Sequence, residues 1–153
     1  MATDTNETPT ALLLLGCPQV PVQTSVAIHL CDQLRERGIT PVIAGTGAAR
    51  KLIEVADPKR HYIGELIDLD LCIDHIAEKE RDFTYAFVFI HNDGGISYAG
   101  TISAISKARL FGIVYGEHAD ETATAITFPC EVIAVKATHN PMPLIVRLGK
   151  VLP

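Results

Sequence analysis

The sequence lacks the features that mark several common protein classes. It has no tryptophan, its 13 Lys and Arg are outnumbered by 18 Asp and Glu, and the formal net charge is −5. Binding to phosphate backbones requires clustered cations, so we expect no nucleic-acid partner. Its apolar runs are far shorter than the roughly 20 residues that cross a bilayer, so we expect no membrane partner.

The cysteines also exclude some classes. Cys17, Cys31, Cys72 and Cys130 form no CxxC pair, whereas closely spaced pairs are typical of metal fingers and of disulfide frameworks. Residues 1–10 are polar and lack the basic, apolar start of a signal peptide. We therefore expect free thiols, a cytoplasmic location and a flexible tail over residues 1–10.

The remaining residues, 11–153, fit one domain of ordinary size. Hydrophobic residues make up 48% of the chain and charged residues 20%. So high an apolar content must be buried inside the domain or between subunits. We therefore expect a homo-oligomer, most simply a dimer.

Strand-like and helix-like patterns alternate along this domain. Apolar runs typical of buried strands cover residues 11–15, 39–44, 63–69, 85–90, 110–115 and 131–137. Between them, apolar residues recur at helical spacing. Such alternation predicts right-handed crossovers and a mostly parallel sheet with helices on both faces. The prediction is a single Rossmann-like, three-layer α/β domain with an open sheet of five or six strands.

Local signals define the ends of several predicted helices. Gly38 is a typical residue after a helix end, and Thr46 is a typical N-cap. The helix after Thr46 should direct Ala49, Leu52 and Ile53 inward. Asn140 followed by a proline predicts the N-cap and first residue of a closing helix.

Reactive or polar residues follow five of the predicted strands. Because parallel strands end at one edge of a sheet, these residues should meet in the crevice where open α/β sheets bind ligands. The candidates for catalysis are Cys17, His91 and Asp93. The candidates for ligand binding are Gly16, Gln23, Thr24, Ser25, Gly45, Thr46, Asn92, Gly94, Gly95, Ser97, Glu117, His118 and His139.

The turn over residues 16–25 differs from the usual dinucleotide-binding turn. It has one glycine and two prolines in place of GxGxxG. The turn after the second strand carries Thr46 where an acidic residue normally binds the ribose. Ordinary NAD or FAD binding is therefore disfavoured, although residues 23–25 could hold an anion at the helix start.

Cys17 and His91 are the most reactive of the candidates. A thiol near a helix N-terminus suits a nucleophile, a metal ligand or a redox group, or it simply fills a tight turn. His91 and Asp93 offer an acid or base beside the glycine amides, although Asn-Asp-Gly-Gly is also ordinary turn chemistry. If the strand order reverses between 11–15 and 85–90, Cys17 and His91 flank the switch point.

A metal site built from Cys17, His91, His118 and His139 would need ligands from four separate loops. No HxH or HExxH spacing supports such a site, so we predict none. The sequence names no cofactor, and a small anionic ligand or cofactor is the expected partner.

Four segments carry a resemblance to a known family. Residues 16–21 read GCPQVP, residues 44–46 read AGT, residues 52–58 read LIEVADP and residues 134–141 read AVKATHNP. Over residues 11–150 the sequence resembles an uncharacterised family from methanogenic archaea. The resemblance implies a Rossmann-like domain, a cytoplasmic location and no established activity, and it carries no catalytic residue.

Two fainter resemblances concern the fold and its crevice. The chain is similar to cobalamin-binding domains, but Gly16-Cys17-Pro18 stands where their Asp-x-His-x-x-Gly motif begins. It is also similar to small sulfur-relay α/β proteins, in which a cysteine beside such a sheet carries a persulfide, although the turn around Cys17 is unlike theirs. Three functions remain open: a small-molecule or cofactor-binding protein of methanogen-type metabolism, a transferase or sulfur-transfer enzyme with Cys17 as nucleophile, and an assembly subunit without chemistry.

Overall fold

In the computed structural model, residues 7–153 are described, and six strands alternate with six helices along them. The elements are β1 (Thr10–Leu15), α1 (Val22–Glu36), β2 (Thr40–Gly45), α2 (Gly47–Ala56), β3 (Glu65–Asp68), α3 (Leu69–Ala77), β4 (Tyr85–Ile90), α4 (Asp93–Ile105), β5 (Arg109–Val114), α5 (Ala119–Thr124), β6 (Glu131–Ala134) and α6 (Met142–Gly149). Of the predicted tail over 1–10, residues 1–6 lie outside the described part of the chain.

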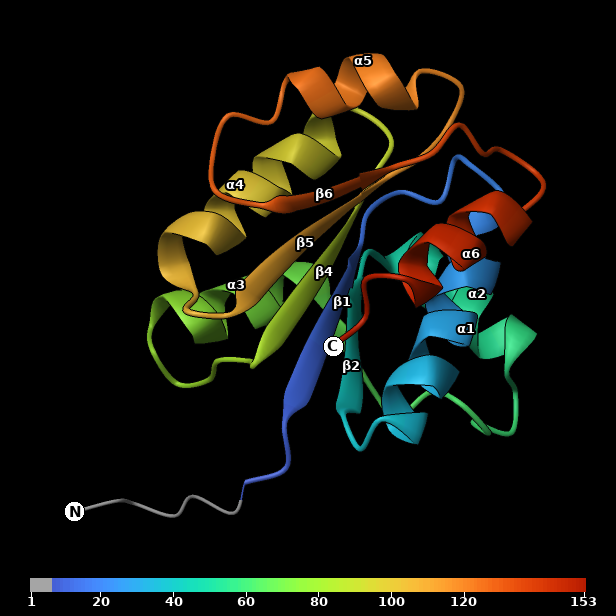
Figure 1. The fold of residues 1–153 in the computed structure, drawn as a ribbon. Helices are drawn as coiled ribbons and strands as arrows, with labels where there is room; N and C mark the ends of the chain where they lie inside the picture. The colour runs from blue at the N-terminus through green and yellow to red at the C-terminus, as the bar shows by residue number, and fades with distance from the viewer. Residues whose placement is uncertain (1–6) are drawn as a thin grey trace.

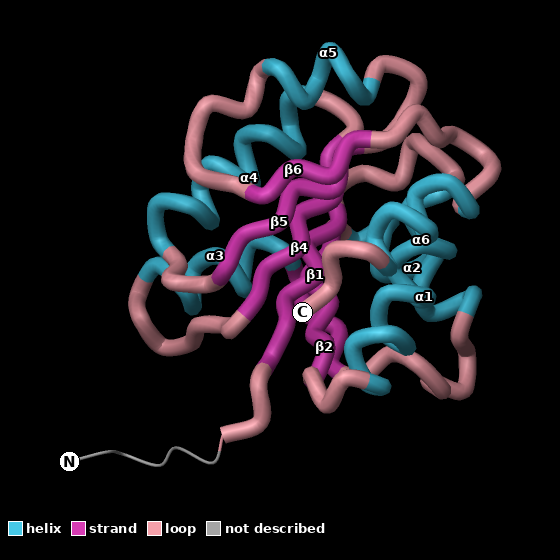
Figure 2. The backbone as a smooth tube through the Cα atoms, viewed as in Figure 1, coloured by secondary structure: helices cyan, strands magenta, loops and turns pink. Residues whose placement is uncertain are grey.

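The six strands form one parallel sheet in the order β3-β2-β1-β4-β5-β6. Figures 1 and 2 show this order from β2 to β6. The chain starts at the centre, runs outward to β3, returns through α3 to β4 beside β1, and then runs outward in the other direction. The predicted Rossmann-like α/β fold is confirmed. The reversal lies between β1 and β4. The loop after β1 leads to α1 on one face of the sheet and the loop after β4 leads to α4 on the other, an arrangement that leaves a crevice between them.

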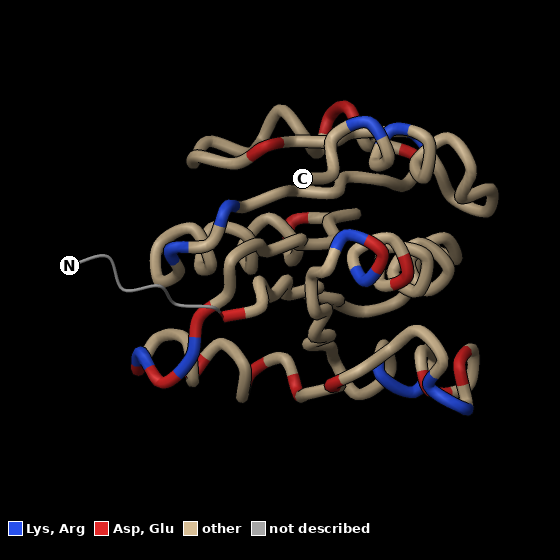
Figure 3. The backbone as a smooth tube through the Cα atoms, turned by 60° about the horizontal axis from the view of Figure 1, so that its bottom comes forward, with Lys and Arg blue, Asp and Glu red and all other residues tan. Residues whose placement is uncertain are grey.

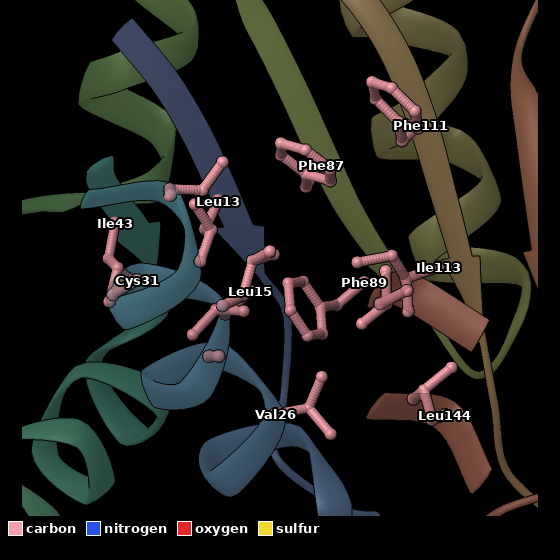
Figure 4. Close-up of a cluster of buried hydrophobic side chains, with 14 of the residues drawn as sticks. Leu13, Leu15, Val26, Cys31, Ile43, Phe87, Phe89, Phe111, Ile113 and Leu144 are labelled. Carbon is pink, nitrogen blue, oxygen red and sulfur yellow. The ribbon is translucent and has the colours of Figure 1, made fainter. Parts of the chain in front are cut away.

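Helices cover both faces of the sheet. The apolar side chains of α1, α2 and α6 pack on one face, and those of α3, α4 and α5 on the other. Leu13 and Leu15 enter the first core, shown in Figure 4, while Leu12 and Leu14 enter the second. Because both faces are buried, β1 is an unbroken apolar run rather than an alternating one.

Side chains at the strand ends cap α2, α3 and α4, and Asn92 provides the cap of α4. The Thr46 hydroxyl accepts a hydrogen bond from the Ala49 amide at 3.3 Å, as predicted, and Asp68 caps α3 in the same way. The chain leaves α1 through Gly38, whose φ of +73° confirms its predicted place after the helix.

Some sequence predictions differ from the structure in detail. Leu52 does not point inward: it is 43% exposed, because Ala49 and Ile53, four residues apart, already form the face of α2 that contacts the sheet. The last helix begins at Met142, one residue later than expected, and Asn140 Oδ1 accepts from the Met142 amide at 3.1 Å. The last strand ends at Ala134, three residues earlier than expected.

Charged side chains are mixed on this scaffold. Figure 3 shows Lys and Arg interspersed with Asp and Glu along the backbone. Among the described residues, no helix has the length and apolarity required to span a bilayer.

Candidate functional site

A cavity of about 210 Å³ lies at the switch point between β1 and β4. The turn after β1, the end of β4 and the start of α4 form most of its wall, and the N-cap of α2 completes it. Its lining residues are Gly16, Cys17, Thr46, Phe89, His91, Asn92, Gly94, Gly95 and Tyr98. Seven of these nine are candidates from the sequence, so three of the five predicted strand-end clusters meet here.

Gly95 allows α4 to approach β4 closely enough to form this cavity. A Cβ atom on Gly95 would lie 2.8 Å from the Cα of Ile90 and 3.1 Å from the carbonyl oxygen of Phe89. Both contacts are with backbone, which cannot rotate aside. A glycine is therefore required here for packing, whereas in a loop it would serve conformational freedom.

The start of α4 is occupied by its own cap. Asn92 Oδ1 accepts from the amides of Gly94 and Gly95 at 3.1 and 3.4 Å. These are the same amides that the sequence predicts as an anion-binding site. A ligand reaches them only by displacing the Asn92 side chain.

The turn that carries Cys17 is fixed on both sides. The Val22 amide donates to the carbonyl of Thr138 at 3.1 Å, and Gln23 Nε2 donates to the carbonyl of Gly16 at 3.0 Å. Cys17 itself is exposed and free. A thiol held in a rigid, accessible turn can react with a molecule in the cavity.

His91 links the cavity to buried polar groups. Its Nε2 lies 3.3 Å from both Gln19 Oε1 and Asn92 Nδ2, and its Nδ1 lies 3.4 Å from the Tyr115 hydroxyl. Partial burial lowers the pKa of His91 below its ordinary value. The imidazole is therefore neutral near pH 7 and can accept a proton.

The other sequence candidates lie outside this cavity. Gln23 is buried, and both polar ends of its side chain are hydrogen-bonded within the protein. Thr24 and Ser25 line a separate groove of about 530 Å³ with Ile28, Ala56 and Tyr62. The backbone of Gly45 is buried in β2, and its carbonyl accepts from Arg50. Five further candidates are exposed: Asp93, Ser97, Glu117, His118 and His139.

Sequence reasoning missed four residues of the site. Phe89 and Tyr98 form apolar walls, and Gln19 and Tyr115 contact His91. Phe89 and Tyr115 belong to runs that were interpreted only as strand core. The available signal was their position near the carboxyl end of a strand, close to the predicted crevice.

The lining contains no lysine or arginine. Within residues 7–153, no three His, Cys, Asp or Glu side chains are grouped closely enough to hold a metal ion. The site therefore offers a thiol, an imidazole, a hydroxyl and a carboxamide, which act by hydrogen bonding and proton transfer.

Comparisons with known proteins agree on the family and the fold. A family model described as a domain of unknown function (DUF1890) matches residues 12–151. An uncharacterized protein of the methanogen Methanocaldococcus jannaschii, MJ0452, is 33% identical over 143 residues, covering 92% of this chain and 95% of the relative. A solved structure described as the structure of MT0777 is similar with a TM-score of 0.86 and 35% identity, covering 94% of this chain and 96% of that one.

Proposed function

The chain belongs to the DUF1890 family, a domain of unknown function, and we propose that it binds a small molecule of methanogen metabolism in the cavity between β1 and β4. The observation that carries the proposal is the meeting of Cys17, Thr46, His91 and Asn92 around one cavity at the switch point. Ligands of open α/β sheets bind at this position.

The size of the cavity limits the ligand. Its volume of about 210 Å³ is below the ~300–1,000 Å³ of ordinary ligand pockets. A whole dinucleotide is larger than this volume and would extend outside the cavity. The enclosed part of the ligand is the size of a small organic acid or a single functional group.

The lining indicates how such a ligand would be held. Phe89 and Tyr98 supply apolar contacts, and Thr46 and His91 supply polar ones. The anionic ligand expected from the sequence stays a prediction. Because no cation lines the cavity, we propose a polar ligand of low charge, held by hydrogen bonds. The free thiols are compatible with the expected cytoplasmic location.

Native mass spectrometry of gently purified protein tests the proposal. We expect a co-purifying small molecule in the wild type and a lower occupancy in C17A and H91Q. C130S and H118Q are the matched controls, since these residues lie outside the cavity, and they should keep wild-type occupancy. Equal occupancy in all four variants would contradict binding at this cavity, and so would the absence of any bound molecule in the wild type.

A second function is favoured by the shared position of Cys17 and His91. Both side chains line the same cavity, and neutral His91 can take the thiol proton. The resulting thiolate would attack an electrophilic atom of the substrate, and the leaving group would recover the proton from His91. In this transferase reaction Asp93 is the less suitable base, because it is exposed and does not line the cavity.

We also infer that two copies associate through the outer face of α2. Leu52 is 43% exposed and Val55 is 75% exposed, one turn apart on this face. Lys51 and Glu54 are exposed beside them. An antiparallel two-fold pairing of α2 would place Lys51 of each copy against Glu54 of the other and bury the apolar residues between them.

A further inference from the structure

We infer that a hydrogen-bond relay holds His91 as the neutral Nδ1–H tautomer, so that its Nε2 lone pair selects a ligand with a hydrogen-bond donor. The relay joins Gly16, Gln23, Tyr115, His91 and Asn92. The tautomer is a property of the protein alone, and only the statement about the ligand rests on the proposed binding function.

The buried end of the relay fixes the direction of its first bonds. Gln23 is 1% exposed, and its Nε2 donates to the carbonyl of Gly16 at 3.0 Å. A carbonyl only accepts, so the orientation of the Gln23 carboxamide is determined. Its Oε1 then faces Tyr115 and also only accepts. The Tyr115 hydroxyl must therefore donate to Gln23.

The direction at Tyr115 sets the proton on His91. A phenol has one proton, and Tyr115 gives it to Gln23. Towards His91 the phenol oxygen only accepts. The 3.4 Å contact with the imidazole is a hydrogen bond when Nδ1 carries the hydrogen.

The other end of the relay requires the same tautomer independently. Asn92 Oδ1 is held by the amides of Gly94 and Gly95. Its amino group is left 3.3 Å from His91 Nε2. An amino group only donates, so Nε2 must accept.

Gln19 is the remaining neighbour of His91 Nε2, and its Oε1 lies 3.3 Å away. This carboxamide belongs to the turn after β1, and the contact is exposed. A half-turn of the amide exchanges its oxygen for its amino group. Gln19 can therefore follow the tautomer, whereas backbone groups hold Gln23 and Asn92 in place.

The relay specifies what the cavity can recognise. Nε2 is on the exposed edge of the ring, where its contacts with Gln19 and Asn92 lie, while Nδ1 faces the interior. A neutral Nε2 accepts one hydrogen bond, and without ligand this is the 3.3 Å contact from the Asn92 amino group. A ligand hydroxyl, thiol or N–H group competes with Asn92 for this lone pair, whereas a ligand that has acceptors only finds no donor at Nε2.

Nitrogen-15 NMR of the imidazole rings, recorded without ligand, tests the relay. The wild type should show a protonated Nδ1 and an unprotonated Nε2 at His91, assigned by the signals lost in H91Q. Tyr115→Phe keeps the buried ring and removes the acceptor, and it should change the tautomer ratio roughly fivefold towards Nε2–H, the effect of one ordinary hydrogen bond. Tyr85→Phe, a phenol at the opposite end of β4, should leave the ratio unchanged.

Asn92→Asp tests the other end. Aspartate keeps the cap of α4 but presents a carboxylate oxygen to Nε2, which should then carry a proton. A wild-type ring in the Nε2–H form would overturn the relay. A tautomer ratio that stays the same in both Tyr115→Phe and Asn92→Asp would also overturn it.

The donor preference has its own probes, methyl glycolate and methyl acetate, which are uncharged and differ by one hydroxyl. Methyl glycolate should shift the His91 Nε2 signal and bind roughly fivefold more tightly than methyl acetate, as expected for one ordinary hydrogen bond. Equal responses to the two esters would overturn donor selection. No response to either ester, with the tautomer confirmed, would count against the donor preference and leave the relay intact.

Discussion

Cys17 and His91 differ in how firmly the surrounding structure holds them. Cys17 lies exposed in the turn after β1, directly before Pro18, and the Gln19 amide donates to its carbonyl at 2.9 Å. His91 is partly buried, and its ring lies 5.6 Å from the ring of Tyr115. The imidazole is therefore the positioned partner, and the thiol is the accessible one.

This difference predicts the reactivity of Cys17. Replacing His91 with Gln should slow alkylation of Cys17 by iodoacetamide about tenfold near neutral pH, because the proton acceptor is lost. Because the pKa of His91 is lowered, the wild-type rate advantage over a model thiol should persist as the pH falls through the ordinary histidine value of about 6.5. It should disappear only below the lowered pKa, when the ring becomes protonated.

Peptide mass spectrometry measures the modification at Cys17, and His118→Gln is the matched control. His118 also follows a strand but does not line the cavity, so this variant should react like the wild type. A Cys17 that reacts no faster than a model thiol would contradict the nucleophile hypothesis.

The sequence predicted the position of both residues because each lies within two residues of a strand's end, and the ends of parallel strands share an edge. It did not predict Gln23 and Tyr115 as their supports. Gln23 was a ligand candidate on account of its polar side chain near a helix start, and Tyr115 was the last residue of a strand. Their roles depend on burial and on a contact between residues 92 positions apart, which no local pattern contains.

The start of α4 is the element on which the cavity depends. Its packing on β4 is close because residue 95 has no side chain. The start of α2 is the contrasting case, since a Cβ on Gly47 would have no neighbour within 4 Å. The two glycines occupy equivalent first turns after parallel strands, but only Gly95 is required for packing.

Gly95→Ala should therefore lower the free energy of unfolding by roughly 2 kcal/mol, the usual cost of overpacking, and should disturb the cavity as α4 moves away from Phe89. Gly47→Ala should be neutral or stabilising by up to about 1 kcal/mol, since alanine favours the helix. Urea denaturation of the two variants measures the difference. Equal stabilities would show that α4 adjusts without cost.

The sequence did not predict the orientation of α2 or the end of β6, because tertiary packing decides both. Ala49, Leu52 and Ile53 are all apolar at helical spacing, but α2 is rotated so that Leu52 faces outward. The last strand is shorter because its regular parallel pairing with β5 ends at Ala134. Beyond it the Gly116 amide donates to the carbonyl of Ala137 at 2.8 Å in an isolated antiparallel bridge. A sequence pattern defines an apolar face but not how far the helix rotates on the sheet.

For the molecule as a whole, the outward Leu52 gives the expected dimer a specific surface. On the outer face of α2, the exposed side chains of Leu52 and Val55 lie beside those of Lys51 and Glu54. A face with opposite charges along one flank is complementary to itself under a two-fold rotation.

We therefore expect a dimeric mass in light scattering and a monomeric mass for the double variant L52D/V55D. Lys51→Glu should weaken the dimer by like-charge repulsion, and adding Glu54→Lys should restore it. Val146→Asp, on the exposed side of α6 at 51% exposure, is the control and should remain dimeric. A monomeric wild type would refute the dimer, and loss of the dimer only in Val146→Asp would place the interface on α6.

Hydrophobic period, turn residues and the polar residues after each strand are local properties of the chain. They were therefore sufficient to predict the α/β class and the edge of the sheet where Cys17, Thr46 and His91 meet. The strand order, the close approach of α4 to β4, the buried Gln23–Tyr115 support and the rotation of α2 depend on contacts between distant segments. Those contacts form only when the cores on both faces of the sheet pack, so the folded structure alone decides which polar residues become a cavity and which remain on the surface.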